Sequence, residues 1–145
     1  MIALLQRVSS AEVTVAGDSI AAIGRGLLVL VGVQADDTPQ RMRRLGDRLL
    51  GYRVFPDADD RMNESLLQQG LELLLVPQFT LAADTRKGAR ASFSHAATSQ
   101  MAEEYFAALL AYCRERIPGT GSGRFAANMQ VALVNDGPVT FWLQT

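Results

Sequence analysis

The chain of 145 residues has few of the side chains from which metal and disulfide sites are built. It contains one cysteine, Cys113, and one histidine, His95. A single cysteine excludes an intrachain disulfide and a cysteine-based zinc site, and a single histidine excludes a histidine-rich metal site within one chain. We therefore expect a protein that binds no metal.

Long apolar segments are also missing. The longest apolar run, Leu27–Val33, is far shorter than the roughly 18 residues that a membrane-spanning helix needs. The first residues reach Gln6 and Arg7 without the basic segment, long apolar stretch and cleavage site of a secretory signal. We expect a cytoplasmic protein that does not contact a membrane.

Neither sign of charge is in large excess. The chain has 14 basic and 15 acidic residues, and Lys87 is the only lysine. Proteins that coat nucleic acid without specificity are usually basic over a whole face. The balance argues against such a protein, and no DNA partner is expected, but a nucleic-acid substrate held locally stays possible.

The length suggests one domain, residues 1–145, of the α/β class. Thr38 and Pro39 predict the start of a helix that ends near Gly51, and Thr98 or Ser99 predicts the start of a second helix that ends near Arg116. Met101, Tyr105, Leu109 and Tyr112 are expected to form the buried face of the second helix. Apolar alternation and short apolar runs predict strands over residues 11–15, 20–23, 27–33, 54–55, 71–76, 129–134 and 139–143. This order favours a mixed sheet with two main helices on one side.

Residue patterns of common catalytic sites are weak here. His95 follows Ser94 in a loop-like segment, and no Gly-x-Ser-x-Gly segment is present, so a serine–histidine hydrolase has little support. Cys113 is expected to be a buried helix residue rather than a nucleophile. The segment Gly119–Gly123 resembles a dinucleotide-binding loop, but it follows a helix and precedes a strand, the reverse of the required order. No cofactor is expected.

Two segments are unusual. Pro77–Leu81 (Pro-Gln-Phe-Thr-Leu) directly follows an apolar strand and offers donors that suit a substrate carbonyl or an oxyanion. Asn135–Thr140 (Asn-Asp-Gly-Pro-Val-Thr) is most simply a turn between two strands. The same Gly-Pro pair can also present two consecutive carbonyl groups on a rigid backbone.

These two segments resemble motifs of the D-aminoacyl-tRNA deacylase family, also called the D-tyrosyl-tRNA deacylase family. The family carries Ser-Gln-Phe-Thr-Leu and Asn-x-Gly-Pro-Val-Thr, and the matching segments here lie about sixty positions apart. Similarity extends through Gln6–Val8, Ala83–Gly88 and Phe141–Leu143. Two distant motifs with matching segments between them make the resemblance specific.

The resemblance implies an ester hydrolase that removes D-amino acids, and glycine mischarged on tRNA-Ala, from tRNA. It implies a single-domain three-layer β/β/α sandwich and a homodimer with active sites at the subunit interface. Gly137 and Pro138, joined by a cis bond, would reach into the partner's site and exclude L-amino acids, with Arg7 bracing them. Phe125 and Met129 would be wall residues of the pocket.

The resemblance assigns Gln78, Phe79 and Thr80 to the catalytic pocket, and two mechanisms stay open. Thr80 could attack the ester, although no base is visible nearby and an unactivated hydroxyl is a weak nucleophile. Alternatively, the terminal 2′-hydroxyl of the tRNA assists, and backbone N–H groups around Phe79 and Thr80 stabilise the oxyanion. The absence of a catalytic triad favours the second mechanism.

The sequence departs from the family pattern at two positions. Pro77 replaces the usual serine and removes a hydroxyl and an N–H group. Ala126 replaces a glycine and could narrow the pocket or shift the backbone if that glycine has a positive φ.

A basic segment follows the first motif. Arg86, Lys87 and Arg90 could contact phosphates of the acceptor stem, or they could form an ordinary solvated loop. Two rival functions also stay open: a non-catalytic nucleic-acid-binding module and an esterase for small molecules.

Overall fold

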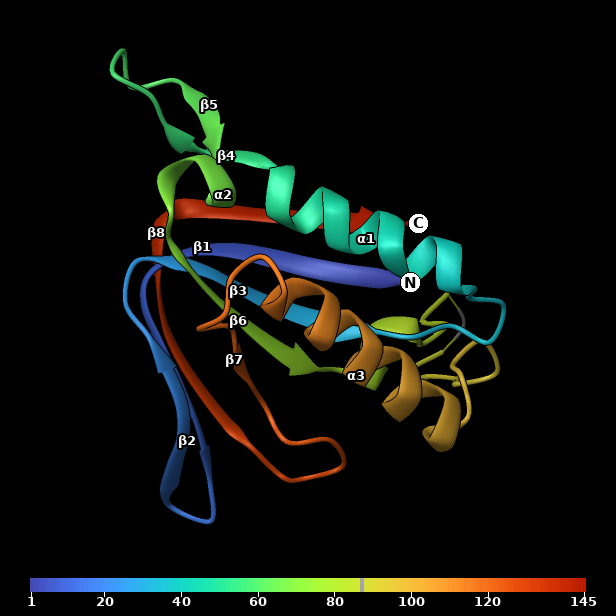
Figure 1. The fold of residues 1–145 in the computed structure, drawn as a ribbon. Coiled ribbons are helices and arrows are strands. Elements are labelled where there is room, and N and C mark those ends of the chain that lie inside the picture. Colours follow the sequence, from blue (N-terminus) through green and yellow to red (C-terminus); the bar gives the residue numbers. More distant parts are fainter. Residues whose placement is uncertain (87) are drawn as a thin grey trace.

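A mixed six-stranded sheet organises the computed structural model, which describes residues 1–86 and 88–145 (Figure 1). Its strands run in the order β2-β1-β3-β6-β7, and β8 also pairs with β1. β1 is antiparallel to β2, β3 and β8, whereas β3, β6 and β7 are parallel. The strands are β1 (Ile2–Val15), β2 (Asp18–Ile23), β3 (Gly26–Gly32), β6 (Glu72–Pro77), β7 (Gly121–Ser122) and β8 (Gln130–Gln144). The predicted mixed sheet is confirmed.

β1 is a long strand whose two halves have different neighbours. Residues 2–8 lie between β3 and the second half of β8, and residues 10–15 lie between β2 and the first half of β8. The pairing of β1 with β8 shifts register around Val8, where the sheet changes direction. The sheet therefore curves toward a barrel. The layer order β/β/α stays an expectation of the resemblance.

Two apolar clusters cover opposite faces of the central strands. The larger cluster packs odd-numbered residues such as Leu27, Val29 and Leu75 against the helices. The smaller cluster packs Leu28 and Leu74 against β2, the second half of β1 and the first half of β8. Because both faces of β3 and β6 are buried, these strands are apolar almost without interruption.

The two main helices begin where the sequence predicts. α1 (Pro39–Gly51) is capped by Thr38, which accepts a hydrogen bond from the Arg41 N–H group. α3 (Ser99–Arg114) is capped by Thr98 in the same way. α3 buries Phe106, Leu109 and Cys113. Of the face predicted for this helix only Leu109 is fully buried; Met101, Tyr105 and Tyr112 are half-buried, because the stripe that meets the sheet lies one residue further along.

The short strand predicted at residues 54–55 is confirmed as part of β4 (Arg53–Pro56), but several other small elements were not predicted. β4 pairs with β5 (Met62–Ser65), and a one-turn helix α2 (Leu66–Gln69) follows. A 3₁₀ turn, η1 (Phe79–Ala82), follows β6. None of the helices described is long and apolar enough to cross a membrane.

The prediction of two closing strands joined by a turn was wrong. β8 is continuous alongside β1, and the Asn135–Thr140 segment is a bulge in it rather than a hairpin turn. Between Gln6 and Val8, β1 advances two residues while β8 advances five, from Thr140 back to Asn135. The extra β8 residues have no partners in the β1 register, and Asp136, Gly137 and Pro138 are exposed.

Candidate functional site

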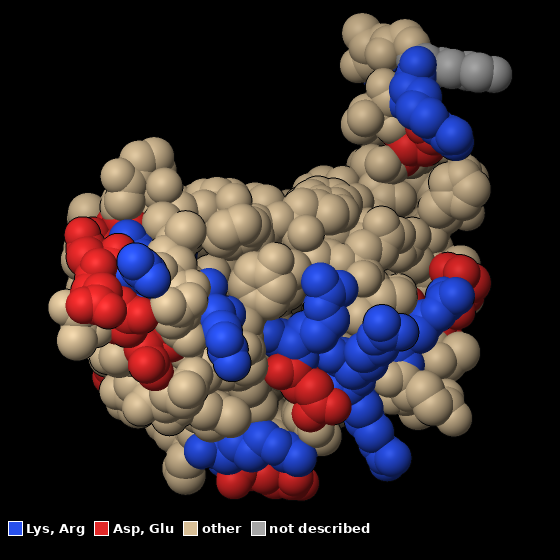
Figure 2. All heavy atoms as spheres, turned by 90° about the horizontal axis from the view of Figure 1, so that it is seen from above, with Lys and Arg blue, Asp and Glu red and all other residues tan. Residues whose placement is uncertain are grey.

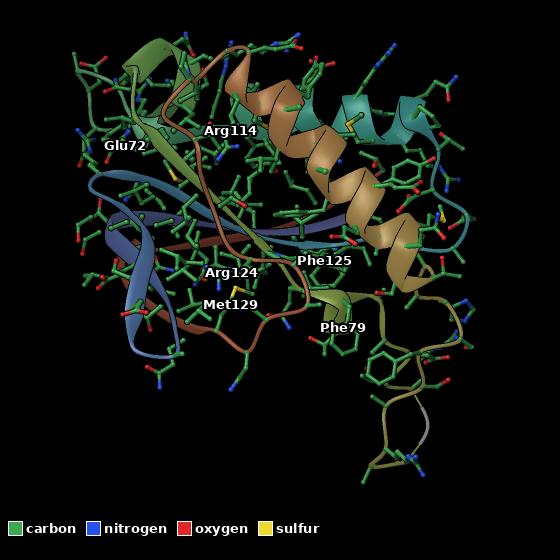
Figure 3. The ribbon with its side chains drawn as sticks, turned by 60° about the horizontal axis from the view of Figure 1, so that its bottom comes forward. Glu72, Phe79, Arg114, Arg124, Phe125 and Met129 are labelled. Atoms are coloured by element: carbon green, nitrogen blue, oxygen red, sulfur yellow. The ribbon has the colours of Figure 1, made fainter. Side chains whose placement is uncertain are left out.

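A cavity of about 520 Å³ opens at the carboxyl end of β6. The end of β6, the start of α3 and the segment that leads into β8 form its walls, and Figure 3 shows Phe79, Phe125 and Met129 on this side of the sheet. Ligand sites in parallel sheets commonly lie beyond the carboxyl ends of the strands. The lining is mostly apolar and consists of Val76, Pro77, Gln78, Phe79, Ala96, Ala97, Ser99, Ala102, Phe125, Ala126, Ala127, Met129 and Val131.

The first motif forms the floor of this cavity and turns away from the sheet. The Gln78 N–H group donates to the Val31 carbonyl at 2.7 Å, which completes the pairing of β6 with β3. The chain then enters η1, whose first N–H groups, those of Phe79 and Thr80, have no acceptor within the turn. Gln78 and Phe79 line the cavity, whereas Thr80 does not.

The Thr80 hydroxyl is not placed beside a base. The Gln78 amide Nε2 donates to Thr80 Oγ1 at 2.5 Å. An amide donor cannot accept the hydroxyl proton, so this contact does not activate Thr80 as a nucleophile. His95 is exposed and does not line the cavity, in agreement with its interpretation as a loop residue.

Cys113 is also unsuited to catalysis. The side chain is buried in α3, and burial raises the pKa of the thiol to about 12. Because the thiolate is the reactive form, the thiol is inert at neutral pH. Within residues 1–86 and 88–145, no group of three His, Cys, Asp or Glu side chains is arranged to hold a metal ion.

Both departures from the family pattern lie at the cavity. Pro77 is the last residue of β6, opposite Val31 and two residues beyond Leu75, where the pairing of β6 with β7 ends. Ala126 has φ 59°, in the left-handed region that favours glycine. The chain therefore keeps a glycine-like backbone at Ala126 and adds a methyl group to the wall of the cavity.

The second motif forms the β8 bulge and is held by its own side chains. Asn135 Oδ1 accepts from the Val139 N–H group at 2.7 Å, and Asn135 Nδ2 donates to Thr140 Oγ1 at 2.8 Å. The Gly137–Pro138 peptide bond is cis. Asn135 and Thr140 belong to the sequence motif, but the sequence did not predict that their side chains hold the bulge together.

Gly137 has no room for a side chain. Its φ is +144°, and a Cβ atom there would lie 2.7 Å from Val139 Cγ2 and 2.9 Å from the Val139 nitrogen. Both the backbone conformation and the crowding require glycine at this position.

Arg7 anchors the bulge to the sheet. Its Nε donates to the Asp136 carbonyl at 2.9 Å, and its Nη1 donates to the Val54 carbonyl at 2.7 Å. The guanidinium also pairs with the Asp136 carboxylate at 3.4 Å. These contacts join Arg7 to the bulge and to β4, and the bracing role that the resemblance implies for Arg7 stays a prediction.

The bulge and the cavity lie apart in one chain. The bulge is beside Arg7 of β1, whereas the end of β6 lies level with Ala3 of β1 through the Val31 pairing. Four strand residues separate these levels, which is about 13 Å. Gly137 and Pro138 do not line the cavity of their own chain.

The basic segment lies on a loop that projects beyond Phe79 (Figure 3). Arg86 pairs with Asp84 through Nη2 at 2.6 Å and Nε at 2.9 Å, and this guanidinium lowers the pKa of the Asp84 carboxyl. The charge of Arg86 is therefore partly balanced. Arg90 is exposed, and Lys87 lies outside the described residues. Figure 2 shows arginine side chains on this projection and a larger group of arginines on the face that α1 covers.

Comparison with known proteins supports one family over nearly the whole chain. The family model described as D-Tyr-tRNA(Tyr) deacylase matches residues 4–144. D-aminoacyl-tRNA deacylases from Serratia proteamaculans (strain 568) and Escherichia coli O81 (strain ED1a) are each 56% identical over 144 residues, 99% of both chains. The enzyme of the same name from Alkalilimnicola ehrlichii is 58% identical and covers 99% of this chain and 96% of its own.

Two solved structures share the fold. One, described as c-Myc DNA Unwinding Element Binding Protein, has a TM-score of 0.96 and 38% identity and covers 100% of this chain and 99% of its own. The other, described as a probable eukaryotic D-amino acid tRNA deacylase, has a TM-score of 0.87 at 17% identity, covers 99% and 98%, and supports the fold alone.

More than half of the residues are identical to those of curated deacylases over the full length, which identifies the protein as an enzyme of the hydrolase class. The chain belongs to the D-Tyr-tRNA(Tyr) deacylase family.

Proposed function

We propose that this protein hydrolyses the ester bond that joins a D-amino acid to the terminal ribose of tRNA. The observation that carries the proposal is the full-length match to the family, with identities of 56–58% to enzymes named D-aminoacyl-tRNA deacylase. The products are a free D-amino acid and a free tRNA, and the activity belongs to quality control of translation in the cytoplasm.

The bond-breaking step uses water, the substrate and backbone donors, while Gln78 lines the cavity that positions the ester. Water attacks the ester carbonyl carbon, the carbon–oxygen bond to the ribose breaks, and the ribose oxygen leaves with a proton. The N–H groups of Phe79 and Thr80 stabilise the oxyanion, and the neighbouring 2′-hydroxyl of the substrate assists the attack. The donor contact of Gln78 to Thr80 supports this pathway over attack by the Thr80 hydroxyl.

The substrate amino acid lies in the cavity beside Gln78, with Phe125 and Met129 as wall residues. A backbone segment rejects L-amino acids by steric exclusion, because backbone atoms do not depend on which side chain the substrate carries. We assign this filter to Gly137 and Pro138, whose carbonyl groups hold the α-amino group. Glycine has no side chain for the filter to reject, so glycine mischarged on tRNA-Ala is also a substrate.

The filter acts in the site of a second copy, so the functional unit is a homodimer. Support comes from the separation of about 13 Å along the strands between the bulge and the cavity of one chain. Support also comes from the contacts of Arg7 and Asn135, which hold the bulge in its projecting position.

The experiment compares deacylation of D-Tyr-tRNA and L-Tyr-tRNA without added metal. Rapid loss of the D-ester alone supports the activity and the filter, and it also means that Pro77 and Ala126 are tolerated. Hydrolysis of both esters contradicts the filter, and hydrolysis of neither contradicts the proposed activity.

Adding a simple D-amino-acid ester without tRNA to this assay separates the two rival functions. An esterase for small molecules would hydrolyse simple D-amino-acid esters as fast as the tRNA ester. A binding module, the role that the name c-Myc DNA Unwinding Element Binding Protein gives to one similar structure, would hydrolyse neither. The net charge of −1 does not favour broad binding to DNA by this chain.

A further inference from the structure

Two phenylalanine rings lie together at the edge of the cavity and remain largely in solvent. Phe79 is 61% exposed and Phe93 is 43% exposed. Their ring centroids are 5.2 Å apart, and the planes are inclined by 46°. Phe79 lines the cavity, so the pair extends the apolar surface of the site outward onto the projecting loop.

The pair does not serve the core. Neither ring belongs to the two apolar clusters that pack the sheet and the helices. Exposed aromatic rings that contribute little to packing commonly mark a binding surface.

The backbone around Phe93 is held in place. Asp84 and Ser92 exchange two backbone hydrogen bonds, of 2.7 and 3.0 Å, which close the base of the loop. The Phe93 carbonyl accepts from the Ala96 N–H group at 3.0 Å, next to the start of α3. Phe93 is thus presented beside Phe79 by a fixed turn rather than by a free loop tip.

We propose that Phe79 and Phe93 form a stacking surface for the unpaired bases that precede the terminal nucleotide of the tRNA acceptor end. This inference rests on the proposed function, because it assumes that the ester of the terminal nucleotide enters the adjoining cavity. Unpaired RNA bases stack on aromatic side chains, and such stacking tolerates any base.

Charge on the same loop favours an RNA strand over a second protein surface. Residues 84–95 carry three basic side chains, Arg86, Lys87 and Arg90, and one acidic side chain, Asp84. Phosphates that link stacked bases need positive charge beside the aromatic surface, as single-strand binding sites provide. Contact with a second copy of this chain, whose net charge is −1, would not require a group of positive charges beside the two rings.

The test uses two esters that share the reacting group. One is D-tyrosyl adenosine and the other is D-tyrosyl-CCA, in which two cytidines precede the same adenosine. For the wild-type enzyme we expect a lower KM with the trinucleotide. In Phe93→Ala the KM for the trinucleotide should rise on the order of tenfold and approach the KM for the adenosine ester. This is the effect expected from the loss of one stacked base. Phe93→Tyr should restore the difference.

Leu67→Ala is the matched control, because Leu67 lies in α2 and is 46% exposed. It should keep the wild-type KM values for both esters. If Phe93→Ala behaves like Leu67→Ala, or if the wild-type enzyme does not distinguish the esters, the stacking proposal is overturned while the deacylase activity stands. Failure on both short esters by a wild-type enzyme that hydrolyses D-Tyr-tRNA would overturn the stacking proposal alone, and failure on D-Tyr-tRNA as well would overturn both proposals. A dimer that dissociates in Phe93→Ala during sedimentation would assign the ring to an interface between copies and overturn the stacking role.

Discussion

Thr80 tests the chemistry at the scale of one side chain. Its hydroxyl accepts a hydrogen bond from the Gln78 amide rather than donating to a base. We expect Thr80→Ala to retain hydrolysis of D-Tyr-tRNA within about tenfold of the wild-type rate, because the hydroxyl is not the nucleophile in the proposed mechanism. Loss of a nucleophile would lower the rate by far more than the 10²–10⁴-fold typical of one acid–base group. Single-turnover rates measure the difference. A loss near the full rate enhancement would instead make Thr80 the nucleophile.

Ala126 tests a single backbone conformation. Holding a residue with a side chain in the left-handed region costs roughly 1–2 kcal/mol. Replacement by glycine removes this cost but also gives the unfolded chain more conformational freedom, which offsets part of the gain in stability. We expect Ala126→Gly to raise the free energy of unfolding by up to about 1 kcal/mol, because φ is 59°. Ala127→Gly is the control and should lower it by about 0.5–1 kcal/mol. Urea unfolding distinguishes them, and a lower stability for Ala126→Gly would contradict the strain.

The β8 bulge is the first test at the scale of an element. Arg7 donates to two carbonyl groups through two nitrogens of its planar fork, Nε and Nη1, and Nε also lies near the Asp136 carboxylate. A lysine keeps the charge but cannot make these contacts together. We expect Arg7→Lys to lower kcat for D-Tyr-tRNA about 10- to 100-fold with a smaller effect on KM, since the bulge would lose its position.

Arg48→Lys provides the matched control for this substitution. Arg48 lies on α1 and donates to the Gln144 carbonyl at 2.8 Å, far from either motif. It should keep the wild-type kcat. Equal kcat values for the two variants would show that Arg7 has no positioning role.

The projecting loop is the second element with a testable role. Replacement of Arg86 and Arg90 by alanine should raise KM for D-Tyr-tRNA and reduce the slope of log KM against log salt by about 0.7 for each lost phosphate contact. The effect of Arg86 should be the smaller one, because Asp84 already binds it. Arg116→Ala, in the turn just after α3, serves as the control. An unchanged slope in the double variant would leave the loop as solvated surface.

The whole-molecule prediction concerns how two copies share a site. In a homodimer with the proposed geometry, Gln78→Ala disables the site of its own chain and Gly137→Ala disables the site of the partner. A mixed dimer of these variants then contains one site with both changes and one site with neither. We expect unfolding and refolding of the two variants together to restore up to about a quarter of the wild-type activity, whereas each variant alone stays inactive.

The control mixes a chain that carries both substitutions with each single variant in turn. Neither mixture should restore activity, because no site in it combines an intact Gln78 with an intact Gly137. Activity that fails to return in dimers of confirmed mixed composition would assign Gly137 to the site of its own chain.

Local signals predicted the main elements well. Thr38 with Pro39 and Thr98 with Ser99 start the two helices because capping depends on a few adjacent residues. The apolar run that contains Leu27 predicted a strand because it is buried on both faces. The short strands β5 and β7 were not predicted, because their pairing partners are distant or their apolar pattern is weak.

Residue types and their order in the chain determined much of the candidate site. The two motifs identified Gln78, Phe79, Gly137 and Pro138, and the lack of a suitably placed histidine or cysteine argued against an ordinary nucleophile. The replacement of a glycine by Ala126 also raised the question of a positive φ at this position, and φ is 59° in the structure. These conclusions follow from chemistry that each residue or short segment carries by itself.

Only the tertiary structure decided which residues meet. The continuous pairing of β8 with β1 turns the expected Gly-Pro turn into a bulge, because β1 offers no partners for the extra residues. The register of β1, β3 and β6 separates that bulge from the cavity at Gln78. The same packing brings together Phe79 and Phe93, which are fourteen positions apart in the sequence. Such contacts depend on the alignment of distant strands and loops, and no local pattern of residues encodes that alignment.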